Sequence, residues 1–571
     1  MLAGVLGLKE AAHHLYPLVG KDVYSPRREV ALGAKGPWAK VLTLERDPRG
    51  YPLWVAVEGI LWYGEEEGAE GALRAFLEKG EGFLSHLTGP FTLVLFDGHA
   101  QKVILYRSRQ GVETLFLAQG PGFLLFASDE ETLFQGDLLI PRVSLQGWRE
   151  LLALGPLRIP GHTYFQGVRE LLPGEGLIWS PEGERRLQVN LPIGYRRDLS
   201  PQEAAEELLF RLQRAVKRLF RPKSGCLLSG GLDSSAIASL LAEETFPLLT
   251  LSLRYEDDER HFQANPFQPS RDDPYVRQMV AWLQTRHEEA LIGPEDLVDH
   301  LLPAMEARGH PGMADIDSSF LVLLIGAREK ADGFFTGEGA DEILGGYPWF
   351  SRPYSPEEGR FPWSAGMEWR ERLVHPDLRP ELRLSDYGRR ELEEAWRSLP
   401  PPPEDEPPLM WRLSHLTYRY FGPVLVERAR AMARKAGVKI FLPFLDEEVV
   451  SFALSLPWEL KAQGGMEKGV LRQAFVGRLP EEVRLRKKSP FPRTFHPRYR
   501  QLVTEALEAI LADPEAPSRR LFAEGTLRAW MAAPGDLEVP WFGQLMRLPQ
   551  LFGYVLQVEG WLRRWGLKPV V

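Results

Sequence analysis

The residues from Gly225 to Glu244 constrain the fold more strongly than any other part of the chain. Gly225 to Leu228 form a short apolar run that predicts a buried strand, and Ser229 to Gly231 predict a tight turn of small residues. A helix is expected over Asp233 to Glu244, because its apolar residues recur with helical spacing. Such a strand, turn and helix gather free backbone N–H groups and the positive end of the helix around one point. We therefore expect an anion site at this turn.

The second part of the chain, from about Leu199 to Val571, alternates predicted strands and helices. An amphipathic helix is predicted over Pro201 to Leu219, and Phe246 to Leu253 is the strand expected after the anion site. This alternation is typical of a parallel sheet, which binds its ligand at the carboxyl ends of the strands. The proline-rich residues 400–408 predict a linker or loop. Helices are predicted over Pro274 to Arg286 and over His415 to Lys435, and the stretches Glu467 to Arg472 and Leu485 to Phe491 supply cations.

A second glycine-rich segment runs from Ala331 to Tyr347. Its predicted strand ends at Thr336, two glycines flank Glu338, and a short helix is expected to begin at Asp341. Four glycines at these places are more than a loose surface turn requires. The segment therefore predicts carboxylates held at a backbone-rich turn, at the carboxyl end of a strand.

The first part of the chain, Met1 to about Asp198, contains short apolar runs separated by glycine and proline, which is typical of sheet layers. One helix is expected near Gly71 to Glu78, with its apolar residues on one face. Few helices among many antiparallel strands favour a sheet sandwich. The predicted strands are Trp54–Val57, Phe91–Phe96, Lys102–Tyr106, Leu115–Leu117 and Phe123–Phe126.

Length and composition exclude several classes of protein. At 571 residues the chain is long enough for about two to four domains. The net charge is −9 and no long basic block is present, so nucleic acid is not expected as a partner. A single cysteine excludes an intramolecular disulfide and a cysteine-based zinc site. Because no apolar run reaches the roughly 18 residues that span a bilayer, and no secretion signal is seen, we expect a cytoplasmic protein with no membrane partner.

Several segments of the second part resemble known families. Ser229 to Ser235, with the sequence Ser-Gly-Gly-Leu-Asp-Ser-Ser, resembles the pyrophosphate loop of the ATP pyrophosphatase superfamily. Thr336 to Tyr347 and the turn Leu442 to Asp446 resemble the asparagine synthetases. The resemblance implies an α/β ATP-pyrophosphatase domain over residues 199–571. Members of the superfamily split ATP into AMP and pyrophosphate as they activate a carboxylate or carbonyl oxygen.

The same resemblance implies roles for individual residues. Asp233 and Asp341 are expected to hold Mg²⁺ on the pyrophosphate, because Mg²⁺ prefers hard oxygen ligands. Glu338 is expected to orient or deprotonate the attacking nitrogen, and Lys488, with Lys487 as second choice, to stabilise the departing charge. The expected ATP contacts are Leu228, Ser229, Gly230, Gly231, Asp233, Ser234, Ser235, Leu251, Thr336 and Gly337.

The first part resembles the glutaminase domain of the asparagine synthetases. The resemblance implies a four-layer N-terminal-nucleophile hydrolase sandwich over residues 1–198. In that family an N-terminal cysteine attacks glutamine, but this chain starts Met1-Leu-Ala-Gly and its cysteine is Cys226. We therefore expect a degenerate domain that cannot hydrolyse glutamine. The matching segments, in order, are Gly89–Asp97, Arg107–Gly111, Leu115–Phe116, Phe126–Asp129 and Leu172–Gly174.

Three further segments bear on the substrates. The family's Asp-Arg-Met-Ser-Met string is replaced by Ala429 to Ala433, so an acid is lost on the acceptor side. Asp317, Ser318 and Ser319 are expected either to border the substrate carboxylate or simply to cap a helix. The acidic stretch from Tyr255 to Glu259 is most simply a solvated loop.

The resemblance implies a carbon–nitrogen ligase that works in two steps. A carboxylate attacks the α-phosphorus of ATP, and a nitrogen nucleophile then attacks the acyl-adenylate and expels AMP. Aspartate is the favoured acid, with ammonia or an amine rather than self-hydrolysed glutamine as nitrogen source. The alternatives are a lactam or macrolactam synthetase, similar to β-lactam synthetases or lasso-peptide cyclases, and a non-catalytic nucleotide-binding paralogue. The sequence is compatible with a homodimer.

Overall fold

The computed structural model describes residues 1–19, 22–36, 38–265, 267–533 and 535–569. The chain forms two compact units. The first unit comprises Met1–Gly147 and Ile159–Pro192, and the second comprises Trp148–Arg158 and Ile193–Val571. Each unit has its own sheets and its own apolar core.

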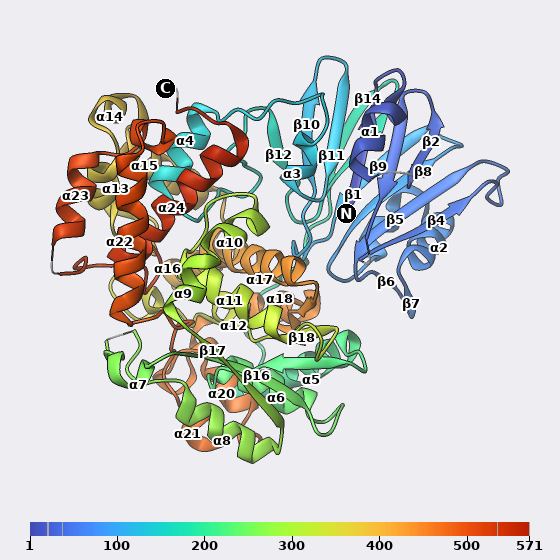
Figure 1. Ribbon diagram of the computed structural model, residues 1–571. Helices are drawn as coiled ribbons and strands as arrows, with labels where there is room; N and C mark the ends of the chain where they lie inside the picture. The colour runs from blue at the N-terminus through green and yellow to red at the C-terminus, as the bar shows by residue number, and fades with distance from the viewer. Residues whose placement is uncertain (20–21, 37, 266, 534, 570–571) are drawn as a thin grey trace. The chain divides into compact units, whose positions relative to one another are not determined.

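Two six-stranded sheets with antiparallel neighbours form the first unit (Figure 1). One sheet has the strand order β12-β10-β11-β1-β3-β2, and the other has the order β14-β13-β9-β8-β5-β4. The first sheet consists of β1 (Leu2–Leu6), β2 (Val23–Arg27), β3 (Val30–Ala34), β10 (Phe116–Gly120), β11 (Phe123–Ala127) and β12 (Val168–Glu170). The second consists of β4 (Ala39–Leu44), β5 (Leu53–Gly59), β8 (Phe91–Asp97), β9 (Lys102–Arg107), β13 (Glu175–Ser180) and β14 (Gly183–Gln188).

The alternation of side chains along these strands separates two apolar cores. Phe126 of one sheet shares a core with Trp54 and Phe96 of the other, so this core lies between the sheets. The opposite side of β5 and β8 packs against α2 (Ala69–Lys79). On the first sheet, α1 (Ala11–Val19) contacts β1 and β3. The unit therefore has the expected four layers of helix, sheet, sheet and helix.

A five-stranded parallel sheet is the framework of the second unit, with the strand order β17-β16-β15-β18-β19. The chain runs outward from β15 through β16 to β17, and then returns to place β18 on the other side of β15. Open α/β sheets bind ligands at the carboxyl ends of the strands where the order reverses in this way. The strands are β15 (Ser224–Leu227), β16 (Leu249–Tyr255), β17 (Arg286–Ile292), β18 (Gly333–Phe335) and β19 (Lys439–Phe441).

Helices surround this sheet as the alternating pattern predicts. The helix α5 (Pro201–Leu219) precedes β15 and is N-capped by Ser200, and α6 (Leu232–Leu241) follows β15 directly. Residues of α11 (Asp315–Ala327) and α17 (Gly422–Ala436) share one apolar core with β15, β16 and β18. Further helices of the second unit are α7 (Asp258–His261), α8 (Asp273–Leu283), α9 (Pro294–Asp299), α10 (Leu301–Arg308), α12 (Ala340–Leu344), α13 (Met367–Leu373), α14 (Arg379–Leu382), α15 (Leu384–Ser398), α16 (Pro408–Leu416), α18 (Glu447–Ser455), α19 (Trp458–Lys461), α20 (Gly469–Ala474), α21 (Glu481–Arg484), α22 (Pro497–Ala512), α23 (Glu524–Ala532) and α24 (Leu548–Trp565).

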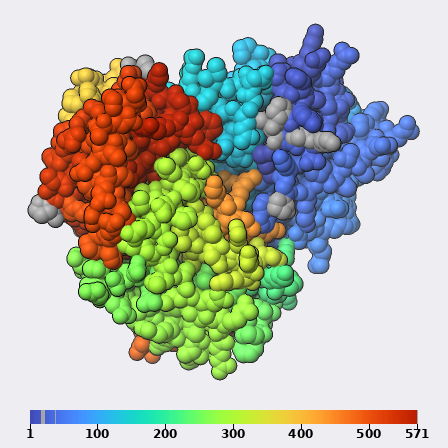
Figure 2. Space-filling view, in the orientation of Figure 1, coloured from blue at the N-terminus to red at the C-terminus, as the bar shows by residue number. Residues whose placement is uncertain are grey.

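The C-terminal helices pack against the middle of the second unit. Helix α24 contacts α10 and α22, and α22 contacts α9. Figure 2 shows the C-terminal segment, in red, beside the segment around residue 300, in yellow-green. Two buried glutamines of α24 bind the segment that leads into α11: the Gln557 side chain accepts from the N–H of Gly312, and Gln550 donates to Asp315. These bonds position the start of α11, which borders the candidate site.

Three local expectations are corrected by the structure. The helix predicted over Pro274 to Arg286 ends at Leu283, because the next residue has a positive φ and Arg286 already begins β17. The helix predicted over His415 to Lys435 is divided by a π-helical turn, Thr417–Phe421, between α16 and α17. Asp317 to Ser319 lie inside α11 and do not cap it, because that helix already begins at Asp315.

Within the described residues, no helix combines the length and the apolar character needed to cross a lipid bilayer.

His415 of α16 is a buried polar group that offers a test of the packing. Its ring is 1% exposed and lies 4.6 Å from the Trp411 ring, and neither ring nitrogen has a hydrogen-bond partner among the described residues. Burial, with smaller effects from the positive charges of Lys461 and Arg419, lowers the pKa of His415 to about 3. The folded protein therefore holds this histidine neutral.

We expect His415→Phe to reduce the acid sensitivity of the fold. Between about pH 6.5 and pH 3 the unfolded chain binds a proton at His415 that the folded chain excludes, so the wild type loses stability as pH falls. Removing this group should lessen the loss by up to about 1.4 kcal/mol per pH unit in that window. Melting temperatures of both proteins from pH 7 to pH 4 measure the effect, with the exposed His86→Gln as control. Parallel pH profiles of wild type and His415→Phe would contradict it.

Candidate active site

A cavity opens at the carboxyl ends of β15, β16 and β18, where the strand order reverses. Most of the residues singled out in the sequence line it, although Gly230 and Ser235 do not. Ser235 is fully buried and is not among the residues that line the cavity. The predicted residues that line the cavity are Leu228, Ser229, Gly231, Asp233, Ser234, Leu251, Thr336, Gly337, Glu338, Asp341, Lys487 and Lys488.

The turn between β15 and α6 is closely packed, which explains its glycines. Gly230 has a φ of +66°, and a Cβ there would lie 2.7 Å from the backbone nitrogen of Val276 in α8. A Cβ on Gly337 would lie 2.5 Å from the backbone nitrogen of Ser234. The backbone N–H of Ser229 donates to the Ser234 hydroxyl at 3.2 Å. The two glycines therefore let the turn after β15 approach both α8 and the turn after β18.

Two aspartates from separate helices meet in the cavity. Asp233 lies in the first turn of α6 and Asp341 in the first turn of α12. The ammonium of Lys468 donates to both oxygens of Asp233, at 2.7 and 2.6 Å, and to Oδ1 of Asp341 at 2.7 Å. Lys488 forms an ion pair with the other oxygen of Asp341. The structure thus brings the predicted metal ligands together and adds Lys468, which the sequence marked only as one cation in the stretch Glu467 to Arg472.

Burial and the two lysines set the protonation of these aspartates. Burial opposes ionisation of Asp341, but the ammonium groups of Lys468 and Lys488 together lower its pKa to about 2. Burial raises the pKa of Asp233, an effect that the charge of Lys468 partly offsets. Asp341 contacts both ammonium groups and is therefore the more firmly ionised of the pair.

Glu338 faces an arginine that the sequence did not single out. The Arg428 guanidinium, from α17, donates to Glu338 and lies 5.4 Å from the ring centre of Phe320 and 4.9 Å from that of Phe491. Burial opposes the charge of Arg428, yet the Glu338 carboxylate raises the pKa of the guanidinium above its ordinary value. Nε of Arg428 and Oε2 of Glu338 are buried without a partner among the described residues. A charged pair with spare hydrogen-bonding atoms therefore stands at this end of the cavity.

The Leu442 to Asp446 turn supports the loop that carries Glu338. Asp446 caps α18 by accepting from the backbone N–H of Glu448, and the residues before it form a single 3₁₀ turn. A Cβ on Gly339 would lie 2.8 Å from Leu445, and the positive φ of Gly339 favours glycine as well. The turn therefore acts as a packing surface beneath the acidic loop.

The basic run Arg486 to Lys488 divides into three environments. Arg486 is buried, stacks 4.0 Å from the ring centre of Tyr275 and donates to Asp272 at 2.6 Å. Lys487 is exposed, although it also lines the cavity. Lys488 makes the ion pair with Asp341. Of the two lysines, Lys488 is thus the one that contacts a predicted metal ligand.

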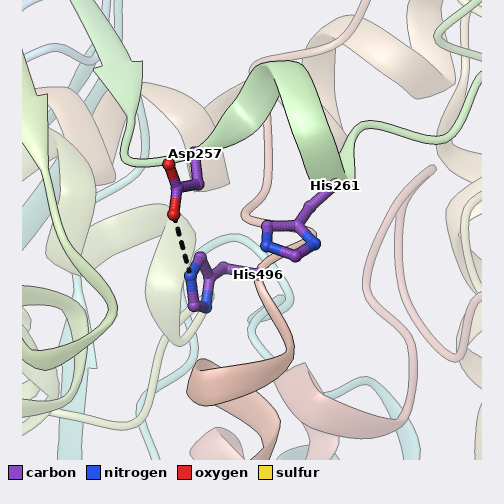
Figure 3. A group of neighbouring side chains, drawn as sticks. All are labelled: Asp257, His261 and His496. Atoms are coloured by element: carbon purple, nitrogen blue, oxygen red, sulfur yellow. Dashed lines mark ion pairs between the residues drawn. The ribbon is translucent and has the colours of Figure 1, made fainter.

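A second group of side chains that can bind metals lies at the start of α22 (Figure 3). His496 points Nε2 toward Oδ2 of Asp257 at 3.9 Å, and its ring lies 4.6 Å from that of His261. The other nitrogen of His496, Nδ1, accepts from the backbone N–H of Arg498. A neutral imidazole so placed carries its proton on Nε2, whereas metal binding through Nε2 needs that atom free. The arrangement therefore favours a pair of Asp257 and His496 at the start of α22 rather than a metal site.

Comparison with known proteins decides the family. The asparagine synthase model matches residues 207–563, and the glutamine amidotransferase domain model matches residues 63–189. The chain belongs to the asparagine synthase family. Members of this family are ligases that use ATP. The two domain types account for the four-layer sandwich of the first unit and for the α/β ATP-pyrophosphatase fold of the second.

Three curated relatives support membership of the asparagine synthase family. Asparagine synthetase [glutamine-hydrolyzing] 3 of Bacillus subtilis (strain 168) is 33% identical over 516 residues, which are 87% of this chain and 82% of that protein. Asparagine synthetase [glutamine-hydrolyzing] of Gallus gallus is 27% identical, over 71% of this chain and 64% of that protein. The Mus musculus protein of the same name is 26% identical, over 78% of this chain and 72% of that protein. The match thus spans slightly less than two thirds of the chicken relative.

Cys226 cannot replace a glutaminase nucleophile in this member of the asparagine synthase family. It is the single cysteine of the sequence, and it lies within β15 of the second unit, fully buried. Burial raises the pKa of its thiol well above the ordinary value, which keeps the thiol protonated and unreactive. The first unit therefore carries the amidotransferase fold without a cysteine.

We expect Gly346→Ala to disturb the paired aspartates. A Cβ at this position would lie 1.9 Å from Oδ1 of Asp341 and 3.1 Å from Cδ of Lys468, so both groups must move. The affinity for MgATP should fall at least about tenfold, or ~1.4 kcal/mol, in isothermal titration calorimetry. Gly326→Ala, on α11 where a Cβ meets open space, is the matched control and should change the affinity less than about twofold. Equal affinities in the two variants would count against a role for Asp341.

Proposed function

We propose that the second unit joins ATP to a carboxylic acid and then forms an amide, with AMP and pyrophosphate as products. One observation carries the proposal: the fold gathers the Ser229 to Ser235 turn, two aspartates, Lys488 and Glu338 around one cavity at the switch point of the sheet. A non-catalytic nucleotide-binding protein would not need Glu338 and Lys488 beside the phosphate turn. We further propose a functional division of the chain near residue 198.

In the first step, an oxygen of the acid attacks the α-phosphorus of ATP, and the bond to the β-phosphate breaks. The backbone N–H groups of the turn and the hydroxyls of Ser229 and Ser234, which line the cavity, bind the phosphates at the positive end of α6. Lys488 stabilises the negative charge that develops on the departing pyrophosphate. Leu228, Leu251, Thr336 and Gly337 line the part of the cavity assigned to the nucleotide.

Asp233 and Asp341 fit a magnesium ion. Both present carboxylate oxygens, the donors that Mg²⁺ prefers, and a cation already lies between them in the form of the Lys468 ammonium. When bound there, Mg²⁺ neutralises charge on the triphosphate and makes pyrophosphate a better leaving group.

In the second step, a nitrogen nucleophile attacks the acyl carbon, the bond to AMP breaks, and the nitrogen loses a proton. Glu338 is suited to orient the nucleophile and accept this proton, because its Oε2 is not used by a described residue and its other oxygen is held by Arg428. Arg428 therefore acts as a positioning residue for Glu338.

Aspartate is the acid that we propose first, with free ammonia as the nitrogen source, so that the product is asparagine. The names of the relatives favour aspartate. The lack of any cysteine in the first unit favours ammonia over glutamine hydrolysed by this chain. The first unit then serves as a retained scaffold.

A second candidate acid is favoured by the cavity wall near Glu338. The side chains beside the Glu338–Arg428 pair are apolar, and Leu425 and Phe421 precede Arg428 by one and two helical turns. Such a wall suits an acid with an apolar body, as in a lactam-forming synthetase. The apolar lining residues are Met313, Ile316, Phe320, Phe421, Leu425, Phe542, Leu545 and Met546.

Exchange of labelled pyrophosphate into ATP tests the proposal. Full-length protein is incubated with MgATP and labelled pyrophosphate, together with aspartate, β-amino acids or acids with apolar bodies, and ammonia or glutamine is added afterwards. Exchange that depends on one class of acid identifies the substrate class. Formation of ADP in place of AMP, or no exchange with any acid despite ATP binding, would overturn the proposal.

Two variants should separate the two steps. Asp233→Asn should lower acid-dependent exchange at least about 100-fold, because the site loses half of its metal-binding charge. Glu338→Gln keeps a hydrogen-bond acceptor for Arg428, so exchange should stay within about threefold of wild type while amide formation falls about 100-fold or more. Equal losses of exchange and amide formation in Glu338→Gln would contradict the assigned proton transfer.

A further inference from the structure

Lys468 occupies the position between the two aspartates that a metal ion would take. We infer that Lys468 is a built-in counter-cation, which holds Asp233 and Asp341 together and keeps free divalent ions out until a nucleotide triphosphate draws its ammonium away. This inference rests on the proposed function in so far as it places Mg²⁺ at the two aspartates. It adds an order of binding: metal and triphosphate enter together, and the bare ion does not enter first.

Every carboxylate oxygen of the pair already contacts an ammonium group. Lys468 has three N–H donors, and they reach both oxygens of Asp233 and Oδ1 of Asp341. Oδ2 of Asp341 is paired with Lys488. Each oxygen that a metal ion would need is therefore already bound to a positive charge.

The position of Lys468 is imposed by its surroundings. Its backbone lies in the left-handed region with a φ of +55°, at the N-cap of α20, and its carbonyl accepts from the N–H groups of Leu471 and Arg472. A lysine in that conformation is strained, and such strain is found where the surrounding structure requires a particular side chain. The side chain is 2% exposed, and Gly346 leaves room for it beside Asp341. The backbone at the N-cap of α20 and the buried side chain thus place the ammonium between the two aspartates.

Charge balance explains why a bare ion would be excluded. The two lysines neutralise the two aspartates, and Glu338 nearby is already paired with Arg428. A divalent ion that entered alone would add two uncompensated positive charges to a buried site, which is costly. A triphosphate brings its own negative charge, so the Lys468 ammonium can move to phosphate oxygens as the metal takes the carboxylates.

Binding of Mn²⁺, a spectroscopic substitute for Mg²⁺, tests the inference by electron paramagnetic resonance on full-length protein without nucleotide. Wild type should bind Mn²⁺ at least about tenfold more weakly without ATP than with ATP. The substitution Lys468→Met should raise the affinity for Mn²⁺ in the absence of nucleotide at least about tenfold. Lys487→Met removes one charge from the same cavity at an exposed lysine and should shift the affinity less than about threefold. The added substitution Asp233→Asn should abolish the gain in Lys468→Met.

Thermal unfolding gives a second measurement if Lys468→Met folds poorly. Loss of the buried cation leaves Asp233 without its ion-pair partner and Asp341 with Lys488 alone, so this variant should melt lower than wild type and recover with Mg²⁺ alone. The wild-type melting temperature should not respond to Mg²⁺ alone. Tight nucleotide-free Mn²⁺ binding by wild type, or no gain in Lys468→Met together with no rescue by Mg²⁺, would overturn the inference. None of these readouts requires an acid substrate, so failure of acid-dependent exchange would refute the proposed function and leave this result standing.

Discussion

The pairing of buried carboxylates with buried lysines at the switch point of the sheet is the interaction on which the rest of the second unit depends. Asp233 and Asp341 lie in the first turns of α6 and α12, and Lys468, at the N-cap of α20, supplies the opposite charge between them. A buried charge is tolerated when it is paired and hydrogen-bonded, and removal of one partner is strongly destabilising. The ion cluster therefore ties these helices together.

The topology of the parallel sheet makes this cluster possible. Because β18 returns to the far side of β15, the turns that follow these two strands face each other at one edge. Gly230 and Gly337 remove the side chains that would keep the backbones apart. Another part of the cavity is built differently, from an arginine–glutamate pair set among aromatic and aliphatic side chains.

The first unit keeps the amidotransferase fold of its family although it contains no cysteine. Its four layers depend on alternating apolar side chains such as Trp54, Val55 and Phe96, which fill the cores on the two sides of one sheet. The glutaminase reaction depends on one nucleophile, and this unit has no cysteine. Packing is distributed over many residues, so the fold does not depend on any single catalytic side chain.

Local signals in the sequence were sufficient for most element types and for the residues of the glycine-rich turns that line the cavity, because strand alternation and glycine turns act over a few residues; the fold classes came from the resemblance to a known family. Where they failed, at the π-helical turn Thr417–Phe421 and at the start of α11, tertiary packing set the local conformation. Lys468 and Arg428 were decided by the tertiary structure: their partners Asp233 and Glu338 lie 235 and 90 positions away in the chain. An ion pair over such a separation has no periodicity to reveal it, since it exists only after the sheet has brought the helices together.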